Sequence, residues 1–138
     1  MLFRSYAIYA FCRIVDDIVD GDGAFADKLP RLQAWRERVA ALYCHQADGP
    51  VTRVLVAAVQ LFDLRREDFL AVIDGMQMDA ETAIVAPDLA TLALYCDRVA
   101  AAVGRLSVRA FGDVSPAADR VAFALGCALQ LTNILRDV

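Results

Sequence analysis

The feature that most constrains the fold is a series of long segments in which apolar residues recur every three or four positions. Short breaks containing glycine or proline separate these segments, and no stretch alternates apolar and polar residues for long enough to form a strand. Apolar residues at this spacing lie on one face of a helix, whereas a half-buried strand alternates them. The sequence therefore predicts an all-α fold.

The breaks set the limits of the predicted helices. The strongest are Asp20 to Gly23, Gly49-Pro50, Pro87-Asp88, Gly112 and Ser115-Pro116, which are typical helix stop and start signals. We expect helices from about Leu2 to Val19, Ala26 to Ala47, Pro50 past Leu61, Arg66 to Ala80, Pro87 to Phe111 and Ser115 to Val138. The second carries an apolar stripe at Leu29, Leu32, Trp35, Val39 and Leu42, and the third carries one at Val54, Leu55, Ala58 and Leu61.

Composition narrows the class of protein. Of the 138 residues, 59% are apolar and 23% are charged, whereas an average soluble domain is about 45–50% apolar. This balance predicts a packed helical protein with a cavity for an apolar ligand, or a piece of a larger domain. The net charge of −4 argues against a nucleic-acid partner. The longest charge-free run, Val121 to Leu135, is shorter than the ~20 residues that span a bilayer.

The cysteines and the N-terminal residues indicate in which cellular compartment we expect the protein. Cys12, Cys44, Cys96 and Cys127 have no metal-hairpin spacing, and His45 is the only histidine, so a zinc site is not expected. The N-terminus has no signal-peptide pattern. We therefore expect a cytoplasmic protein whose cysteines are reduced, small core residues. The apolar excess also fits peripheral contact with a membrane surface.

Three carboxylates crowd the end of the first predicted helix. Asp16 and Asp20 are four apart and share one face with Arg13, while Asp17 is rotated by about 100°. Like charges at this spacing and carboxylates at a helix C-terminus both oppose the helix. A magnesium ion would reverse that repulsion, because it takes oxygen ligands from carboxylates and substrate phosphates. The alternative is a solvated acidic helix end.

A second polar cluster lies near the end of the last predicted helix. Gln130, Asn133 and Asp137 share one face and follow the apolar run Val121 to Leu129. In a helix that is buried all round such groups need partners. Metal, water and diphosphate would serve, and an interhelical hydrogen-bond network is the alternative. Together the two clusters predict two walls of one apolar cavity, with magnesium bridging them to a diphosphate.

Four segments occur in an order that matches a known family. They are Tyr9 to Asp20, Asp74 to Asp79, Tyr95 to Ala100, and Leu129 to Val138. The chain resembles the squalene/phytoene synthase family in these segments, which extend over almost its whole length. The resemblance implies a partial isoprenoid-synthase-type helical bundle around an apolar cavity. It also implies that residues 1–138 form a single partial domain that is truncated at both ends, so we expect weak or no activity from the chain alone.

The resemblance implies a transferase reaction. The family condenses two prenyl diphosphates head-to-head with magnesium and releases diphosphate. Asp88 to Leu92, Tyr95 to Ala100 and Val103 to Val108 are most similar to hopanoid-type presqualene diphosphate synthases, which implies farnesyl diphosphate as substrate and presqualene diphosphate or squalene as product. NADPH is implied only if a reductive second step follows. The alternatives are a phytoene synthase that uses geranylgeranyl diphosphate, a head-to-tail prenyltransferase or terpene cyclase, and an inactive family member acting as an interaction or assembly protein.

The family's motifs also imply roles for single residues of this sequence. Catalytic roles fall to Tyr95, Arg13, Asp16 and Asp20. Substrate diphosphate would be bound by Arg13, Gln130, Asn133 and Arg136, and the metal by Asp16, Asp17, Asp20, Asn133 and Asp137. Two positions depart from the family pattern. Ala101 stands where glycine is frequent, so it would crowd a close helix contact, and Gln77 stands where glutamate is common.

Overall fold

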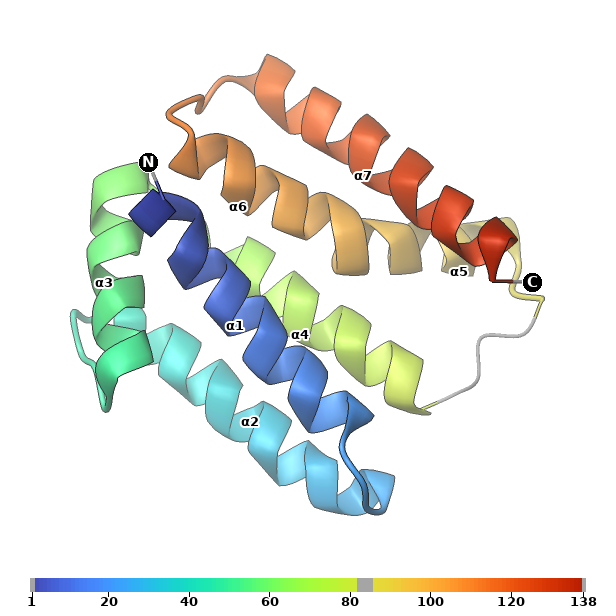
Figure 1. The fold of residues 1–138 in the computed structure, drawn as a ribbon, viewed down its shortest axis with the longest axis horizontal. Helices are drawn as coiled ribbons and strands as arrows, with labels where there is room; N and C mark the ends of the chain where they lie inside the picture. The colour runs from blue at the N-terminus through green and yellow to red at the C-terminus, as the bar shows by residue number, and fades with distance from the viewer. Residues whose placement is uncertain (1, 82–85, 138) are drawn as a thin grey trace.

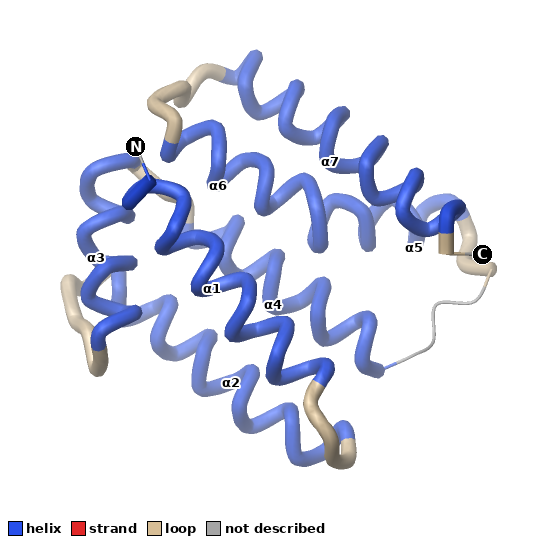
Figure 2. Tube along the Cα trace, in the orientation of Figure 1, coloured by secondary structure: helices blue, strands red, loops and turns tan. Residues whose placement is uncertain are grey.

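The computed structural model describes residues 2–81 and 86–137, and every regular element within those ranges is helical (Figures 1 and 2). The elements are α1 (Leu2–Asp20), α2 (Phe25–Leu42), α3 (Pro50–Phe62), α4 (Arg66–Glu81), α5 (Leu89–Cys96), η1 (Asp97–Ala101), α6 (Ala102–Ala110) and α7 (Pro116–Arg136). The short π-helical segment η1 joins α5 directly to α6. The all-α prediction is confirmed, and the predicted extension of the last helix to Val138 lies outside the described residues.

Helix starts follow the capping residues that the sequence places there. The Asp88 carboxylate accepts a hydrogen bond from the Thr91 N–H at 2.7 Å, and the Ser115 hydroxyl accepts one from the Ala118 N–H at 3.1 Å. Each bond satisfies one of the backbone donors that a helix leaves free in its first turn. Gly112, with φ of +100°, follows the end of α6 as predicted.

The predicted end of the second helix was wrong. Helix α2 ends at Leu42 instead of reaching Ala47. The cause lies in the turn that follows, where His45 has a left-handed φ of 58° and therefore cannot continue a right-handed helix. Apolar periodicity locates the buried face of a helix well, but it locates the end of a helix poorly.

Three aromatic rings form the centre of the core. The Phe11 ring of α1 lies edge-on to Trp35 of α2, with ring centroids 5.8 Å apart, and to Phe69 of α4, at 5.0 Å. Helical spacing brings the other core residues onto the same inward faces: Ala7, Val15 and Ile18 in α1, Leu32, Val39 and Leu42 in α2, Val72 and Ile73 in α4, and Leu106 and Ala110 in α6. The stripe predicted for the second helix is thus largely the observed one.

The helices form layers (Figure 1). Helices α1 and α4 pack against each other, α2 packs on both of them, and α6 packs on both of them as well. Helix α7 is outermost and packs mainly on α5, η1 and α6. The C-terminal ends of α1, α4 and α7 lie toward the same side of the bundle (Figure 1). This arrangement brings distant parts of the sequence to one end of the fold.

Several apolar residues expected in the interior are exposed. Helix α7 is not buried all round, because Val121, Phe123, Leu125, Leu129, Leu131 and Leu135 are exposed. Leu61 of α3 is exposed too, and so is Cys44, although all four cysteines are free as predicted. No helix in residues 2–81 and 86–137 is long and apolar enough to cross a membrane.

An ion-pair network around the buried Asp68 connects the layers. Asp68 of α4 is only 3% exposed, and its carboxylate accepts hydrogen bonds from Arg105 Nε at 2.6 Å and from Arg65 Nε at 3.2 Å. Arg105 also donates through Nη1 to Asp97 Oδ1 at 2.6 Å, and Arg65 pairs with Asp119 of α7 at 2.9 Å. The network therefore connects α4, η1, α6 and α7.

Candidate functional site

The three acidic residues predicted for the site lie at the C-terminal end of α1. Arg13 pairs with two of them: its Nη1 lies 3.8 Å from Asp16 Oδ2 and its Nε lies 3.3 Å from Asp17 Oδ1. Asp20 and Arg13 are exposed, and Asp16 is half-buried. The prediction that Arg13 lies beside Asp16 is confirmed, and Arg13 also reaches Asp17, which was predicted to be rotated away. The metal-binding role of the three acidic residues stays a prediction.

Negative charge accumulates around Asp16. Partial burial raises its pKa above the ordinary value of 3.8, and repulsion from Asp20, Asp17 and Asp79 raises it further, while Arg13 lowers it. Asp79 belongs to α4, so the repulsion comes from two helices. This charge distribution favours a cation beside Asp16.

Tyr95 of α5 connects this acidic end to two further helices. Its hydroxyl donates a hydrogen bond to Asp79 Oδ1 at 3.3 Å. Burial and then the Asp79 charge raise the pKa of Tyr95 to about 12, and a side-chain hydrogen bond with Gln130 of α7 opposes that shift. Tyr95 thus contacts Asp79 of α4 and is influenced by Gln130 of α7, while the Asp79 charge also acts on Asp16 of α1. Tyr95 keeps its proton at neutral pH.

Sequence reasoning did not include Asp79 among the site residues. It lies in the Asp74 to Asp79 segment that matched the family, so the motif was noticed but its individual roles were not assigned. The other end of that segment points elsewhere: Arg36 Nη2 of α2 donates to Asp74 Oδ1 at 2.7 Å and to Gln77 Oε1 at 2.8 Å. Gln77 therefore helps to join α2 to α4.

The remaining predicted residues lie along α7. Arg136 donates through Nε to Asp137 Oδ1 at 3.0 Å, and the Asp137 N–H donates to the Asn133 carbonyl at 3.1 Å. All three residues are exposed, and Gln130 is half-buried. In the described parts of the chain, no ion pair or hydrogen bond joins Asn133, Arg136 or Asp137 to the carboxylates of α1. Among the predicted site residues of α7, only Gln130 interacts with Tyr95.

An apolar groove leads away from Gln130. It has a volume of about 430 Å³ and runs between η1 and α6 on one side and α7 on the other. Its walls include Val103, Phe111 and Leu125, and Gln130 and Asn133 are the polar residues at the C-terminal end of its α7 wall. A groove with one polar end and an apolar body suits a molecule with a polar head and a hydrocarbon tail.

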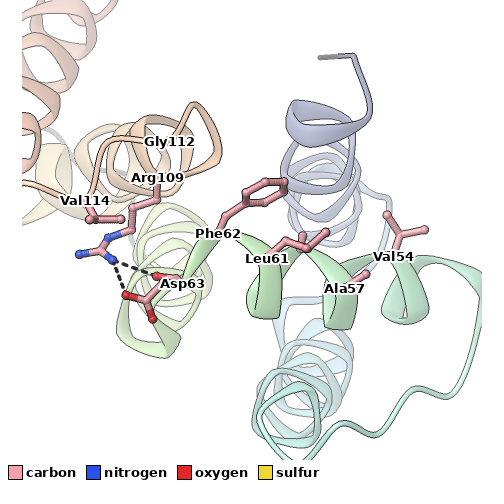
Figure 3. Close-up of a pocket in the computed structure, with 9 residues that line it drawn as sticks. Val54, Ala57, Leu61, Phe62, Asp63, Arg109, Gly112 and Val114 are labelled. Atoms are coloured by element: carbon pink, nitrogen blue, oxygen red, sulfur yellow. Dashed lines mark hydrogen bonds and ion pairs between the residues drawn. The ribbon is translucent and has the colours of Figure 1, made fainter.

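A second cavity, of about 540 Å³, contains none of the predicted site residues (Figure 3). Apolar side chains of α3, among them Val54 and Leu61, form one wall. At one end Arg109, which is 7% exposed, donates through Nη1 to the Asp63 carbonyl at 2.9 Å and to Asp63 Oδ2 at 3.2 Å. These bonds hold the C-terminal end of α3 against α6, so Arg109 has a structural role here.

The charge at Asp16 gives a test based on stability. Because the folded chain raises the pKa of Asp16, the stability that this group contributes is full below the unfolded pKa and is lost as the pH rises through the folded pKa. Asp16→Asn is therefore expected to raise the melting temperature at pH 7 by about 1–2 °C, and to change it little at pH 3. Circular dichroism melts at both pH values measure this, and a lower melting temperature at pH 7 would contradict the charge assignment.

Comparisons with known proteins identify the family of the chain. The sequence profile of the squalene/phytoene synthase family matches residues 4–138. A presqualene diphosphate synthase of Sinorhizobium fredii is 53% identical over 96% of this chain and 47% of its own length, and one of Zymomonas mobilis is 54% identical over 96% and 46%. A phytoene synthase of Mycobacterium tuberculosis is 38% identical over 96% of this chain and 43% of its own length.

A solved structure gives the same result for the fold. The crystal structure of squalene synthase HpnC from Alicyclobacillus acidocaldarius superposes with a TM-score of 0.86 and 31% identity, over 94% of this chain and 48% of that one. The chain thus spans about half the length of the relatives that it matches. Its helices have the fold of that enzyme's matching half, and the chain belongs to the squalene/phytoene synthase family.

Proposed function

We propose that the chain is part of a magnesium-dependent prenyltransferase that condenses two farnesyl diphosphates head-to-head, releases diphosphate and forms presqualene diphosphate or squalene. The observation that carries this proposal is the difference in identity: 53–54% to presqualene diphosphate synthases, against 38% to a phytoene synthase. The groove between α6 and α7 supports it, since it offers an apolar surface for a prenyl tail beside polar groups for a head.

The acidic end of α1 would suit a magnesium ion that also binds diphosphate. Asp16 is surrounded by three other carboxylates and one arginine, and carboxylate oxygens are the ligands that magnesium prefers. In residues 2–81 and 86–137, no three His, Cys, Asp or Glu side chains are placed to hold a metal ion, so the proposal relies on diphosphate oxygens as further ligands. Asp16, Asp17 and Asp20 would hold the ion from α1, and Asn133 and Asp137 from α7. When bound, it would neutralise charge on the leaving diphosphate.

The protein groups would act by position and charge. Arg13 and Arg136 would add positive charge next to the departing diphosphate. Tyr95 would present a protonated hydroxyl at the border between the acidic end and the groove, because its raised pKa keeps the O–H donor in place. The apolar walls of the groove would keep water away from the carbocation that is left on the prenyl chain.

Product analysis tests the reaction. Because weak or no activity is expected from the chain alone, the whole enzyme of which it is proposed to be a part is incubated with farnesyl diphosphate or geranylgeranyl diphosphate. Magnesium or a chelator is added, and the extracted products are identified by mass spectrometry. A head-to-head product from farnesyl diphosphate that requires magnesium is the expected result. A product only from geranylgeranyl diphosphate would make phytoene synthase the better assignment, and a head-to-tail product would exclude both.

Diphosphate binding tests the site independently of turnover. Asp16→Asn is expected to weaken magnesium-dependent binding of inorganic diphosphate about tenfold, which corresponds to about 1.4 kcal/mol, because it removes one charged ligand. Isothermal titration with and without magnesium measures this. Asp22→Asn removes the same charge from the exposed turn after α1 and should leave the affinity unchanged. If the unmodified chain binds no diphosphate at all with magnesium, an interaction protein becomes the better interpretation.

A further inference from the structure

One segment interrupts the regular helical pattern next to Tyr95. Between α5 and α6, residues Asp97–Ala101 form the π-helical segment η1, and the helix continues on both sides of it without a break. A π turn holds one residue more than an α turn. Since each residue turns an α-helix by about 100°, this extra residue changes the direction in which α5 side chains point relative to those of α6.

Two glycines from neighbouring helices pack against η1. A Cβ atom added to Gly126 of α7 would lie 2.8 Å from the Ala101 nitrogen and 2.9 Å from its Cα. A Cβ added to Gly75 of α4 would lie 2.8 Å from Arg98 Cβ. Carbon atoms in contact are normally about 3.5–4.0 Å apart, so both helices approach η1 this closely only because they carry glycine there. Gly126 thus lies directly against the backbone of Ala101, the residue at which crowding was expected.

The two sides of η1 are anchored unequally. On the α6 side, Ala102, Leu106 and Ala110 are fully buried, and Arg105 is held by Asp68 and Asp97. In α5 only Cys96 is buried. The core therefore fixes the rotation of α6, and the direction of Tyr95 depends on how η1 joins α5 to it.

We propose that Gly75 and Gly126 are positioning residues for Tyr95: by admitting the backbone of η1 between α4 and α7, they hold the extra residue that directs the Tyr95 hydroxyl to Asp79 and Gln130. The inference deepens the proposed function, since Tyr95 lies at the border of the proposed diphosphate site. It assigns a functional consequence to the close approach of these two glycines to η1.

The first test asks whether the contact between Tyr95 and Asp79 survives Gly126→Ala. In protein with isotope-labelled tyrosine, the ring resonance of Tyr95 is assigned from its loss in Tyr95→Phe. Asp79→Asn is expected to shift this resonance in the parent chain, because it removes the charge beside the hydroxyl. When Gly126→Ala is also present, Asp79→Asn should no longer shift the Tyr95 resonance. A shift of unchanged size in that background would overturn the inference.

Gly104→Ala is the matched control. A Cβ on Gly104 would lie 3.2 Å from the Ala122 Cβ and carbonyl oxygen, so this variant also strains the contact between α6 and α7, but away from η1. It should lose some stability and keep the full effect of Asp79→Asn on the Tyr95 resonance. If Gly104→Ala abolishes the effect as well, loose helix packing explains the result and the inference fails.

Deletion of Ala100 provides a second variant that adds no side chain. It removes one residue from η1, so α5 should rotate by about 100° relative to α6 while the buried residues of α6 stay in place. We expect native helix content by circular dichroism and a Tyr95 resonance that no longer responds to Asp79→Asn. A preserved response would contradict the proposal. If this variant and Gly126→Ala both fail to fold while Gly104→Ala folds, the glycines serve folding only, and the inference is likewise overturned.

These measurements need no substrate, so they separate the inference from the proposed function. If the whole proposed enzyme yields no prenyl product but the chain shows the expected loss of response, the proposed reaction is wrong and the positioning role stands. If it yields the product and the response survives in Gly126→Ala, the reaction stands and the positioning role is wrong.

Discussion

Replacing Phe11 by alanine is expected to lower the free energy of unfolding by about 3–5 kcal/mol. Phe11 is fully buried between Trp35 and Phe69, and its removal leaves a cavity where three helices meet. Edge-on aromatic pairs add about 0.5–1.5 kcal/mol to the area that they bury. Since a domain is stable by only about 5–15 kcal/mol in total, this single change should remove a large part of the stability.

Urea unfolding followed by circular dichroism measures the effect of Phe11→Ala. Tyr9→Ala is the matched control, because Tyr9 also lies in α1 but is 65% exposed, and it should change the stability by no more than about 0.5 kcal/mol. If the two variants lose the same free energy of unfolding, the buried face of α1 does not stabilise the core in the way described.

Asp68→Ala is expected to lower the free energy of unfolding by about 3 kcal/mol, which is the second large effect. Removing one partner from a buried ion pair leaves the other charge uncompensated, which typically costs about 3–5 kcal/mol. Burial favours the neutral form of Arg105, but hydrogen bonds to Asp97 and Asp68 outweigh it and raise the pKa of Arg105, so the side chain stays charged. In this variant Arg105 still pairs with Asp97, and Arg65 still pairs with Asp119. We therefore expect a loss of stability at the lower end of that range.

Glu67→Ala is the control for Asp68→Ala. Both residues lie in the first turn of α4, so both changes remove a favourable interaction with the helix dipole, about 0.3–1 kcal/mol. Glu67 is exposed, so its loss should cost no more than this. A loss in Asp68→Ala as small as that in Glu67→Ala, again by urea unfolding, would mean that solvent compensates for the missing carboxylate.

Much of the fold could be predicted because helical periodicity involves residues that are close together in the sequence. The inward positions of α1 and α2 follow from apolar spacing, and Ser115 and Asp88 cap helices where the sequence places them. The end of α2 depends on a single left-handed residue, His45, which apolar spacing does not detect. Burial of α7 was overestimated, because apolar character alone does not tell which face meets another helix.

The site was harder to predict than the fold because it depends on contacts between helices. The spacing of Asp16 and Asp20 shows that they share a face, and Arg13 lies beside Asp16 as expected. The sequence gives no comparable rule for the distance between Asp79 and Tyr95, which are joined only in the folded chain. The π turn was missed for a related reason, since the sequence was read with one constant helical period.

Asp16, Asp79, Tyr95 and Gln130 act on one another although they come from four different helices, and this has a thermodynamic consequence. These residues are far apart in the sequence, so the unfolded chain presents no such group to a ligand. A ligand held among them binds the native state alone, and by mass action it stabilises that state by about 2.7 kcal/mol at a concentration one hundred times its dissociation constant. Ligand binding and folding of the helical bundle are then coupled. Loosening any of the four helices therefore lowers the apparent affinity for the ligand.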